Sequence, residues 1–176
     1  MKTFTRFAFK VTVAQAVTYI AAGIVAYPLF TKQFFEGPSP LLAHFARLPG
    51  EPELWGHVTR WMLPAQLLRG VLIAAALYPF LPVLQSWSYA KRFLVLTSLY
   101  VVLGQWTSPV AGANTIEGWV ILRPEFTTPG IIVRVIPEGL MQGLAFGAWL
   151  ARWLGGPGGG PVENGANDSG VAPRSV

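Results

Sequence analysis

Residues 62–83 constrain the fold more than any other stretch, because they form an apolar segment with a single charged residue, Arg69, inside it. A segment of this length can cross the hydrocarbon core of a bilayer as a helix. A guanidinium at that depth is costly unless it is paired, hydrated or able to reach the membrane interface. The segment therefore predicts a membrane protein and raises the question of what Arg69 contacts.

The composition supports a membrane protein and excludes several other classes. Of the 176 residues, 52% are hydrophobic and 12% are charged, whereas a soluble domain carries about 25% charged residues. The chain has no cysteine, which excludes disulfides, thiolate metal sites and cysteine nucleophiles. The net charge of +5 comes from basic residues that mostly flank apolar segments. This distribution is typical of membrane orientation, so we do not expect a nucleic-acid partner.

The apolar segments predict an all-α integral membrane protein, a bundle of four transmembrane helices at about 11–30, 62–83, 93–110 and 131–154. These helices form one membrane domain, residues 1–154. A tail rich in glycine and proline, residues 155–176, is expected to be disordered. The first segment follows a basic start and could be a signal peptide. We expect an uncleaved anchor, because the segment is long for a signal peptide and further spans follow it.

Two long loops, 31–61 and 111–130, are expected to cap the outer side of the bundle. Within them, residues 53–61 predict a short amphipathic helix on the membrane surface, and residues 118–122 resemble an extended segment. Pro64 is expected in the first turn of the second span, where its missing N–H costs little. The loop tryptophans favour an ordered cap.

The orientation follows from the lysines and arginines. They are more frequent in the two terminal segments and the short 84–92 connection than in the two long loops. The positive-inside rule then places both termini in the cytoplasm and the long loops outside. We expect an integral protein of the plasma or inner membrane, with the lipid bilayer as its first partner.

Polar residues inside the second and fourth spans form the strongest candidate site. If these spans are neighbours, four of their side chains form one polar cluster facing the interior of the bundle: Gln66, Arg69, Glu138 and Gln142. The cluster could bind a small polar or anionic group or take part in a proton-coupled step. It could equally be a structural pair that fixes the helix register, with Arg69 extending toward the interface.

Small residues mark candidate packing faces. Gly139, Gly143 and Gly147 recur at every fourth position of the fourth span, and Gly70 and Ala74 offer a matching pair in the second. Such a face lets another helix approach closely. Packing within the chain is the simpler interpretation, and the alternative is a homo-oligomer or another membrane protein docked on the fourth helix.

The sequence gives little support for catalysis or metal binding. Two histidines and two carboxylates of the first loop could bind zinc, but they lack the usual tight spacing: His44, Glu51, Glu53 and His57. Glu117 and Glu125 of the second loop have no accompanying nucleophile, and Arg123 beside them suggests a local charge pair. We therefore expect no metal, no cofactor and no catalytic residue.

Three functions remain as hypotheses. The first is a non-enzymatic accessory or assembly subunit that packs against other membrane helices. The second is a small carrier, or a bundle that binds lipid or a small molecule around Arg69 and Glu138. The third is a membrane-embedded enzyme that uses Glu117, Glu125 or Glu138.

Residues 64–70 also resemble residues 137–143, 73 positions later, as in proteins built from internal repeats.

Overall fold

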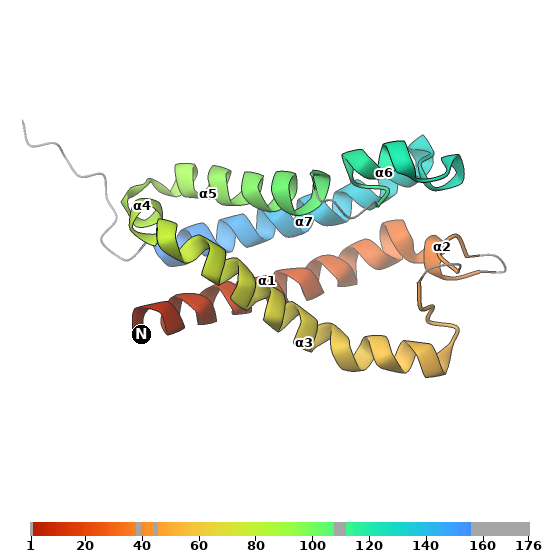
Figure 1. Ribbon diagram of the computed structural model, residues 1–176, viewed down its shortest axis with the longest axis horizontal. Coiled ribbons are helices and arrows are strands. Elements are labelled where there is room, and N and C mark those ends of the chain that lie inside the picture. Colours follow the sequence, from red (N-terminus) through yellow and green to blue (C-terminus); the bar gives the residue numbers. More distant parts are fainter. Residues whose placement is uncertain (1, 38–39, 44–45, 108–111, 156–176) are drawn as a thin grey trace, which may run out of the picture.

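The computed structural model describes residues 2–37, 40–43, 46–107 and 112–155. Helices dominate these residues, and no β-strand occurs among them (Figure 1). The long helices are α1 (Lys2–Ala26), α3 (Pro52–Leu77) and α7 (Pro129–Leu154), with α5 (Tyr89–Ser98) shorter. The predicted all-α class is confirmed.

Short helical segments extend the long ones. A π-helical segment, η1 (Tyr27–Thr31), and α2 (Lys32–Phe35) continue α1, and a second π-helical segment, η3 (Leu99–Trp106), continues α5. The 3₁₀ turn η2 (Tyr78–Phe80) and α4 (Leu81–Ser86) continue α3 past Pro79. The remaining elements are α6 (Ile116–Ile121) and the 3₁₀ turn η4 (Pro124–Phe126).

The helices run lengthwise through an elongated molecule (Figure 1). The start of α1, α4 and the end of α7 lie at one end, here called the terminal end, and α2, α6 and the start of α3 lie at the other, the loop end. Helix α1 packs against both α3 and α7, and α7 packs against α5. The packing order is therefore α3, α1, α7, α5, with α3 and α5 at the two edges.

Among the described residues, three helical stretches are long and apolar enough to cross a membrane: Thr3–Phe35, Pro52–Ser86 and Pro129–Leu154. They contain the predicted first, second and fourth spans. The predicted third span, 93–110, overlaps α5 and η3 up to Trp106, and residues 108–111 lie outside the described residues. The predicted disordered tail also lies outside them, apart from Gly155.

Two local predictions are wrong. Residues 53–61 are not a separate surface helix, because they form the first part of α3 and Pro64 lies inside that helix. Proline is tolerated within apolar, membrane-type helices, where the freed carbonyl can find another partner. Residues 118–122 are not extended, since residues 116–121 form α6. The Thr115 hydroxyl accepts a hydrogen bond from the Gly118 N–H at 2.9 Å, and this N-cap starts the helix.

The core is made where α1 crosses its two neighbours. Val11 and Ala14 of α1, Ala74 of α3 and Leu150 of α7 have no solvent exposure. Close approach of α3 depends on Gly70, because a Cβ there would lie 2.6 Å from the Thr12 Cα. The backbones of α1 and α3 therefore nearly touch at mid-length.

Candidate binding site

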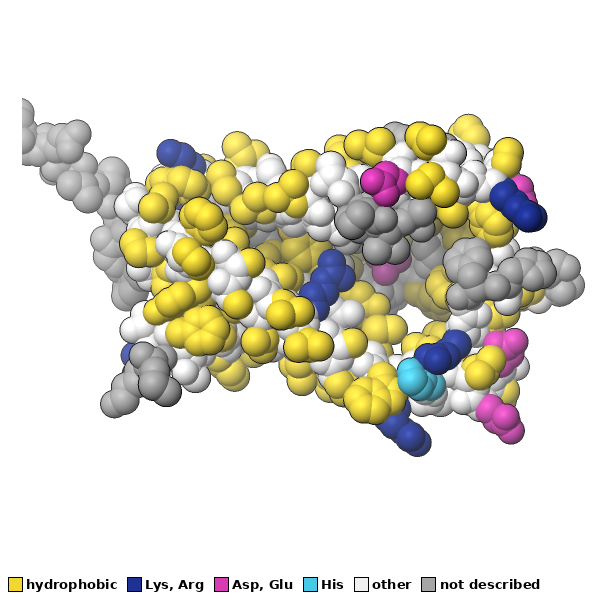
Figure 2. All heavy atoms as spheres, in the orientation of Figure 1, with side chains coloured by type: hydrophobic (Ala, Val, Ile, Leu, Met, Phe, Trp, Pro, Cys, Tyr) yellow, Lys and Arg dark blue, Asp and Glu magenta, His cyan; other side chains and the backbone are white. Residues whose placement is uncertain are grey.

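An apolar groove separates α3 from α5 and η3. It forms a cavity of about 630 Å³, and Figure 2 shows this face of the molecule hollowed between α3 and α5. Phe146 of α7 forms part of its lining. The side chains along its two walls are almost all apolar: Ile73, Ala76, Leu77, Phe80, Val83, Leu84 and Trp87 on one side, and Val95, Leu96, Leu99, Tyr100 and Leu103 on the other.

A polar pocket of about 290 Å³ lies beside this groove. Helices α1, α3 and α7, the η3 segment and the 112–115 turn all contribute to it. Its lining consists of Tyr19, Arg69, Gln105, Asn114, Val135, Glu138, Gly139 and Gln142. The Asn114 side-chain amide donates to Gln105 Oε1 at 2.8 Å, which ties the turn to η3.

Arg69 is the residue that lines both cavities. Its guanidinium carbon lies 5.7 Å from the centroid of the Tyr100 ring, a distance at which a cation is attracted to the aromatic face. No described residue forms an ion pair with Arg69 or with Glu138. Two opposite charges therefore share the polar pocket without being paired to each other.

One buried donor near these charges also lacks a partner. Gln142 is 4% exposed, yet its Nε2 has no hydrogen-bond partner among the described residues. Buried polar groups are nearly always hydrogen-bonded. The Gln142 amide is therefore free to donate to a ligand or to water in the polar pocket.

The structure brings together three of the four residues predicted for the polar cluster, namely Arg69, Glu138 and Gln142. Gln66 does not line the pocket. Its Oε1 accepts a hydrogen bond from Gln15 Nε2 at 2.9 Å, within the interface between α1 and α3. Gln66 therefore joins two helices and is not part of the candidate site.

Gly139, Gly143 and Gly147 of α7 face α5 and η3 of the same chain. A Cβ at Gly143 would collide with a methyl group of Val101, and one at Gly147 would collide with the Thr97 hydroxyl. At Gly139 the nearest atoms belong to Gln105, 3.4 Å away. In α3, Gly70 and the fully buried Ala74 face the core around α1. Internal helix packing accounts for all five small residues.

The loop carboxylates lie away from both cavities. Within the part of the chain that the structure describes, no three histidine or acidic side chains could hold a metal ion together, and His44 lies outside that part. Glu125 forms an exposed ion pair with Arg123, with 3.9 Å between Oε1 and Nη1, as the sequence suggests. Glu117 lies on the exposed side of α6.

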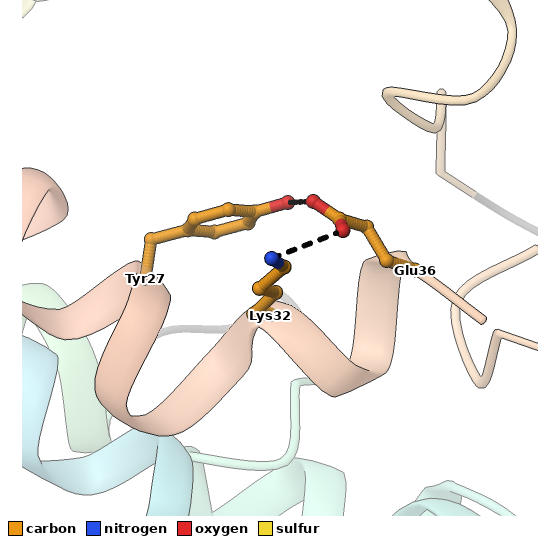
Figure 3. A network of polar contacts seen from close by, with 3 residues as sticks. All are labelled: Tyr27, Lys32 and Glu36. Atoms are coloured by element: carbon orange, nitrogen blue, oxygen red, sulfur yellow. Dashed lines mark hydrogen bonds and ion pairs between the residues drawn. The ribbon is translucent and has the colours of Figure 1, made fainter.

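A separate network of polar side chains lies at the loop end of α1 (Figure 3). The Tyr27 hydroxyl donates to Glu36 Oε1 at 2.6 Å, and Lys32 Nζ lies 3.5 Å from Glu36 Oε2. The hydrogen bond from Tyr27, followed by the charge of Lys32, holds the pKa of Glu36 below its usual value. The three side chains link η1 to the end of α2.

Sequence reasoning missed several residues of the site. Tyr100, Gln105 and Asn114 complete the polar pocket or its border. Gln105 gave a signal, since it is an amide near the end of an apolar span. Tyr100 and the groove-lining residues gave none, because apolar side chains that line a groove have the same chemistry as those that face lipid.

Comparison with protein-family models, curated proteins and solved structures gives no match for this chain.

Proposed function

We propose that this protein binds an amphipathic molecule, with the hydrocarbon tail in the groove between α3 and α5 and the polar head beside Arg69. The proposal treats the chain as a bundle of four transmembrane helices, with the α5–η3 helix as the fourth, both termini in the cytoplasm and the loops outside. Residues 89–106 are helical throughout and, at the α-helical rise of about 1.5 Å per residue, would extend at most roughly 27 Å.

The observation that carries the proposal is the position of Arg69 at the junction of the two cavities. An apolar groove alone on a membrane protein would simply face lipid tails. Here it leads to a guanidinium and to a pocket with polar groups from five parts of the chain. Both chemical halves of an amphiphile therefore find a matching surface within reach of one residue.

The charges favour a zwitterionic head. Arg69 and Glu138 line one small pocket and lack ion-pair partners among the described residues. In a medium of low dielectric constant, unpaired charges are unfavourable. An anionic group beside Arg69 and a cationic group beside Glu138 would satisfy both, whereas a simple anion would meet repulsion from Glu138.

Three ligands with the same alkyl tail test this proposal: dodecylphosphocholine, dodecyl sulfate and dodecyltrimethylammonium. Native mass spectrometry of the full chain in an uncharged maltoside detergent would measure binding of each below its micelle concentration. The zwitterion should bind most tightly. Arg69→Gln should lower its affinity by at least about tenfold, because a charge-assisted hydrogen bond contributes about 1.5–3 kcal/mol. Glu138→Gln should shift the preference toward the sulfate.

Matched variants separate the pocket from general charge effects. Arg134 is exposed on α7 and does not line the pocket, so Arg134→Gln should leave binding unchanged. Glu125→Gln serves the same purpose for Glu138. Equal effects of Arg69→Gln and Arg134→Gln would contradict the proposal.

The tail half of the proposal has its own test on one helix. Ala76 lines the groove and Ala75, its neighbour, does not. Both are exposed on α3. Ala76→Trp should fill the groove and abolish binding of all three ligands, whereas Ala75→Trp should bind like the parent protein. Loss of binding in both variants, or in neither, would argue against a tail in this groove.

The accessory-subunit hypothesis stays a prediction, with less to support it. Its main argument was a glycine face on α7 open to another helix. In the structure, Gly143 and Gly147 meet Val101 and Thr97 of the same chain. Native mass spectrometry after extraction from the native membrane would test it, since a stoichiometric protein partner would favour a subunit over a lipid-binding protein.

A further inference from the structure

A second cleft, separate from the amphiphile site, lies at the terminal end. It is about 300 Å³ in volume and lies between α1, α4 and the end of α7. Its lining combines basic, polar and apolar side chains: Thr3, Arg6, Phe7, Lys10, Leu81, Gln85, Trp153 and Leu154.

Two basic residues enter this cleft from α1. Arg6 and Lys10 are four residues apart, so they lie on the same face of the helix. Lys10 Nζ donates one hydrogen bond to the Trp153 carbonyl oxygen at 3.0 Å, which leaves its two other N–H groups available. Arg6 is exposed and forms no ion pair with any described residue.

No described carboxylate compensates these charges. The described acidic residues other than Glu138 lie in segments of the loop end: Glu36, Glu51, Glu53, Glu117 and Glu125. Figure 2 accordingly shows no acidic side chain toward the terminal end of this face. The terminal end adds Lys91, Arg92 and Arg152 to the two cleft residues, so the described residues at this end carry a positive charge that attracts anions.

The floor of the cleft is hydrocarbon. Phe7, Leu81 and Leu154 line it and are each less than a tenth exposed. Trp153 also lines the cleft, and tryptophan side chains are enriched at the level of the lipid head groups. A site for a free anion requires only the basic side chains. An anionic lipid would contact both the basic side chains and this apolar floor.

We propose that this cleft binds a phosphate group through Arg6 and Lys10. Guanidinium forms paired hydrogen bonds with phosphate oxygens, and basic pockets between helices near the membrane surface bind anionic lipid head groups. Thr3 and Gln85 would add neutral hydrogen bonds, and the apolar floor favours an anionic phospholipid over a free phosphate ion as the source.

The test measures binding of phosphatidylglycerol to the full chain in an uncharged detergent by native mass spectrometry, with phosphatidylcholine of the same acyl chains as reference. Arg6→Gln should lower affinity for phosphatidylglycerol by about fivefold, and Arg6→Lys should restore part of it. Lys91→Gln and Arg152→Gln are matched controls. Both residues are exposed at the terminal end, and neither lines the cleft. Lys91 Nζ lies 4.6 Å from the centroid of the Trp87 ring, which is also outside the cleft.

The outcomes decide the proposal and the source of the phosphate. A loss confined to Arg6→Gln supports the site, while equal losses in all three glutamine variants would show diffuse attraction and overturn it. Binding that is the same in Arg6→Gln as in the parent protein would also overturn it. Competition by millimolar inorganic phosphate would show that the free ion is a sufficient ligand. If phosphate does not compete, the lipid is the ligand. Either outcome supports a phosphate site.

Discussion

The backbone contact between α1 and α3 at Gly70 gives a quantitative prediction. Gly70 and Gly56 both lie in α3, but a Cβ added at Gly70 would lie 2.6 Å from the Thr12 Cα, and one at Gly56 meets nothing within 4 Å. Replacing glycine by alanine within a helix gains about 1 kcal/mol in helix propensity, while overpacking a core costs about 1–3 kcal/mol or more. Because the atom met at Gly70 is backbone and cannot rotate away, the overpacking cost should lie at the upper end of this range. We therefore expect Gly70→Ala to destabilise by about 2 kcal/mol and Gly56→Ala to be neutral or stabilising.

The same reasoning separates backbone collisions from side-chain collisions. At Gly143 the colliding atom is a methyl group of Val101, and the Val101 Cβ lies 3.8 Å away. Val101→Ala should therefore relieve Gly143→Ala, with a coupling energy of about 1 kcal/mol or more. Thr12→Ala should not relieve Gly70→Ala, because the Cα that collides is still present.

Reversible unfolding in mixed detergent micelles, followed by far-ultraviolet circular dichroism, would measure the five single variants and the two double variants. Relief of Gly70→Ala by Thr12→Ala would refute the assignment of that collision to the backbone. A stabilising effect of Gly70→Ala alone would refute the close approach of α1 and α3 altogether.

Two further predictions concern the loop end. Because the folded pKa of Glu36 is lowered, first by the hydrogen bond from Tyr27 and then by Lys32, its contribution is present above the ordinary glutamate pKa and is lost as the pH falls through the lowered folded value. The protection factors of residues 27–36, which are corrected for the intrinsic pH dependence of amide exchange, should fall over that acidic range, and Glu36→Gln should remove this fall; an unchanged profile in this variant would contradict the assignment. Thr115→Ala removes the cap on the Gly118 N–H and should weaken α6 by about 1 kcal/mol, which faster exchange of its amides would reveal and unchanged exchange would exclude.

Three of the residues that line the polar pocket were grouped from the sequence, for a physical reason. Charged and amide side chains inside apolar segments are unfavourable toward lipid, so Arg69, Glu138 and Gln142 were expected to face a common interior, and they line one pocket. Gln66 was grouped with them because it lies three residues before Arg69. One side of α3 faces α1, however, and Gln66 is used there.

The groove could not be predicted in the same way. Its walls carry the same apolar side chains as a lipid-facing surface, and only the divergence of α3 from α5 defines it. The π-helical geometry of η3 could not be predicted from the sequence either. A π-helical turn is wider than an α-helical turn, so it changes which side chains lie on the same face of the helix. This geometry determines how Tyr100 and Gln105 are presented beside Arg69 and Glu138.

The similarity between residues 64–70 and 137–143 is not matched by equivalent packing. Gly70 meets Thr12, whereas Gly143, 73 positions later, meets Val101 and not Gln85, the residue 73 positions after Thr12. The two hairpins, α1 with α3 and α5 with α7, therefore cross at different registers. The similarity between these two short segments therefore does not predict where the neighbouring helix contacts each of them.

The buried amide pair that joins α1 to α3 gives the last prediction. Gln15 is fully buried and Gln66 is 8% exposed, and their hydrogen bond spans 2.9 Å. Gln66→Leu should destabilise by about 1–3 kcal/mol, because the Gln15 amide N–H is left without a partner in the core. The double variant Gln15→Leu/Gln66→Leu should recover most of this loss, since removing both polar groups leaves nothing unsatisfied. If the two single effects simply add in the double variant, when measured by the same unfolding assay, the amide pair does not hold these helices together, and the close contact at Gly70 must determine their crossing.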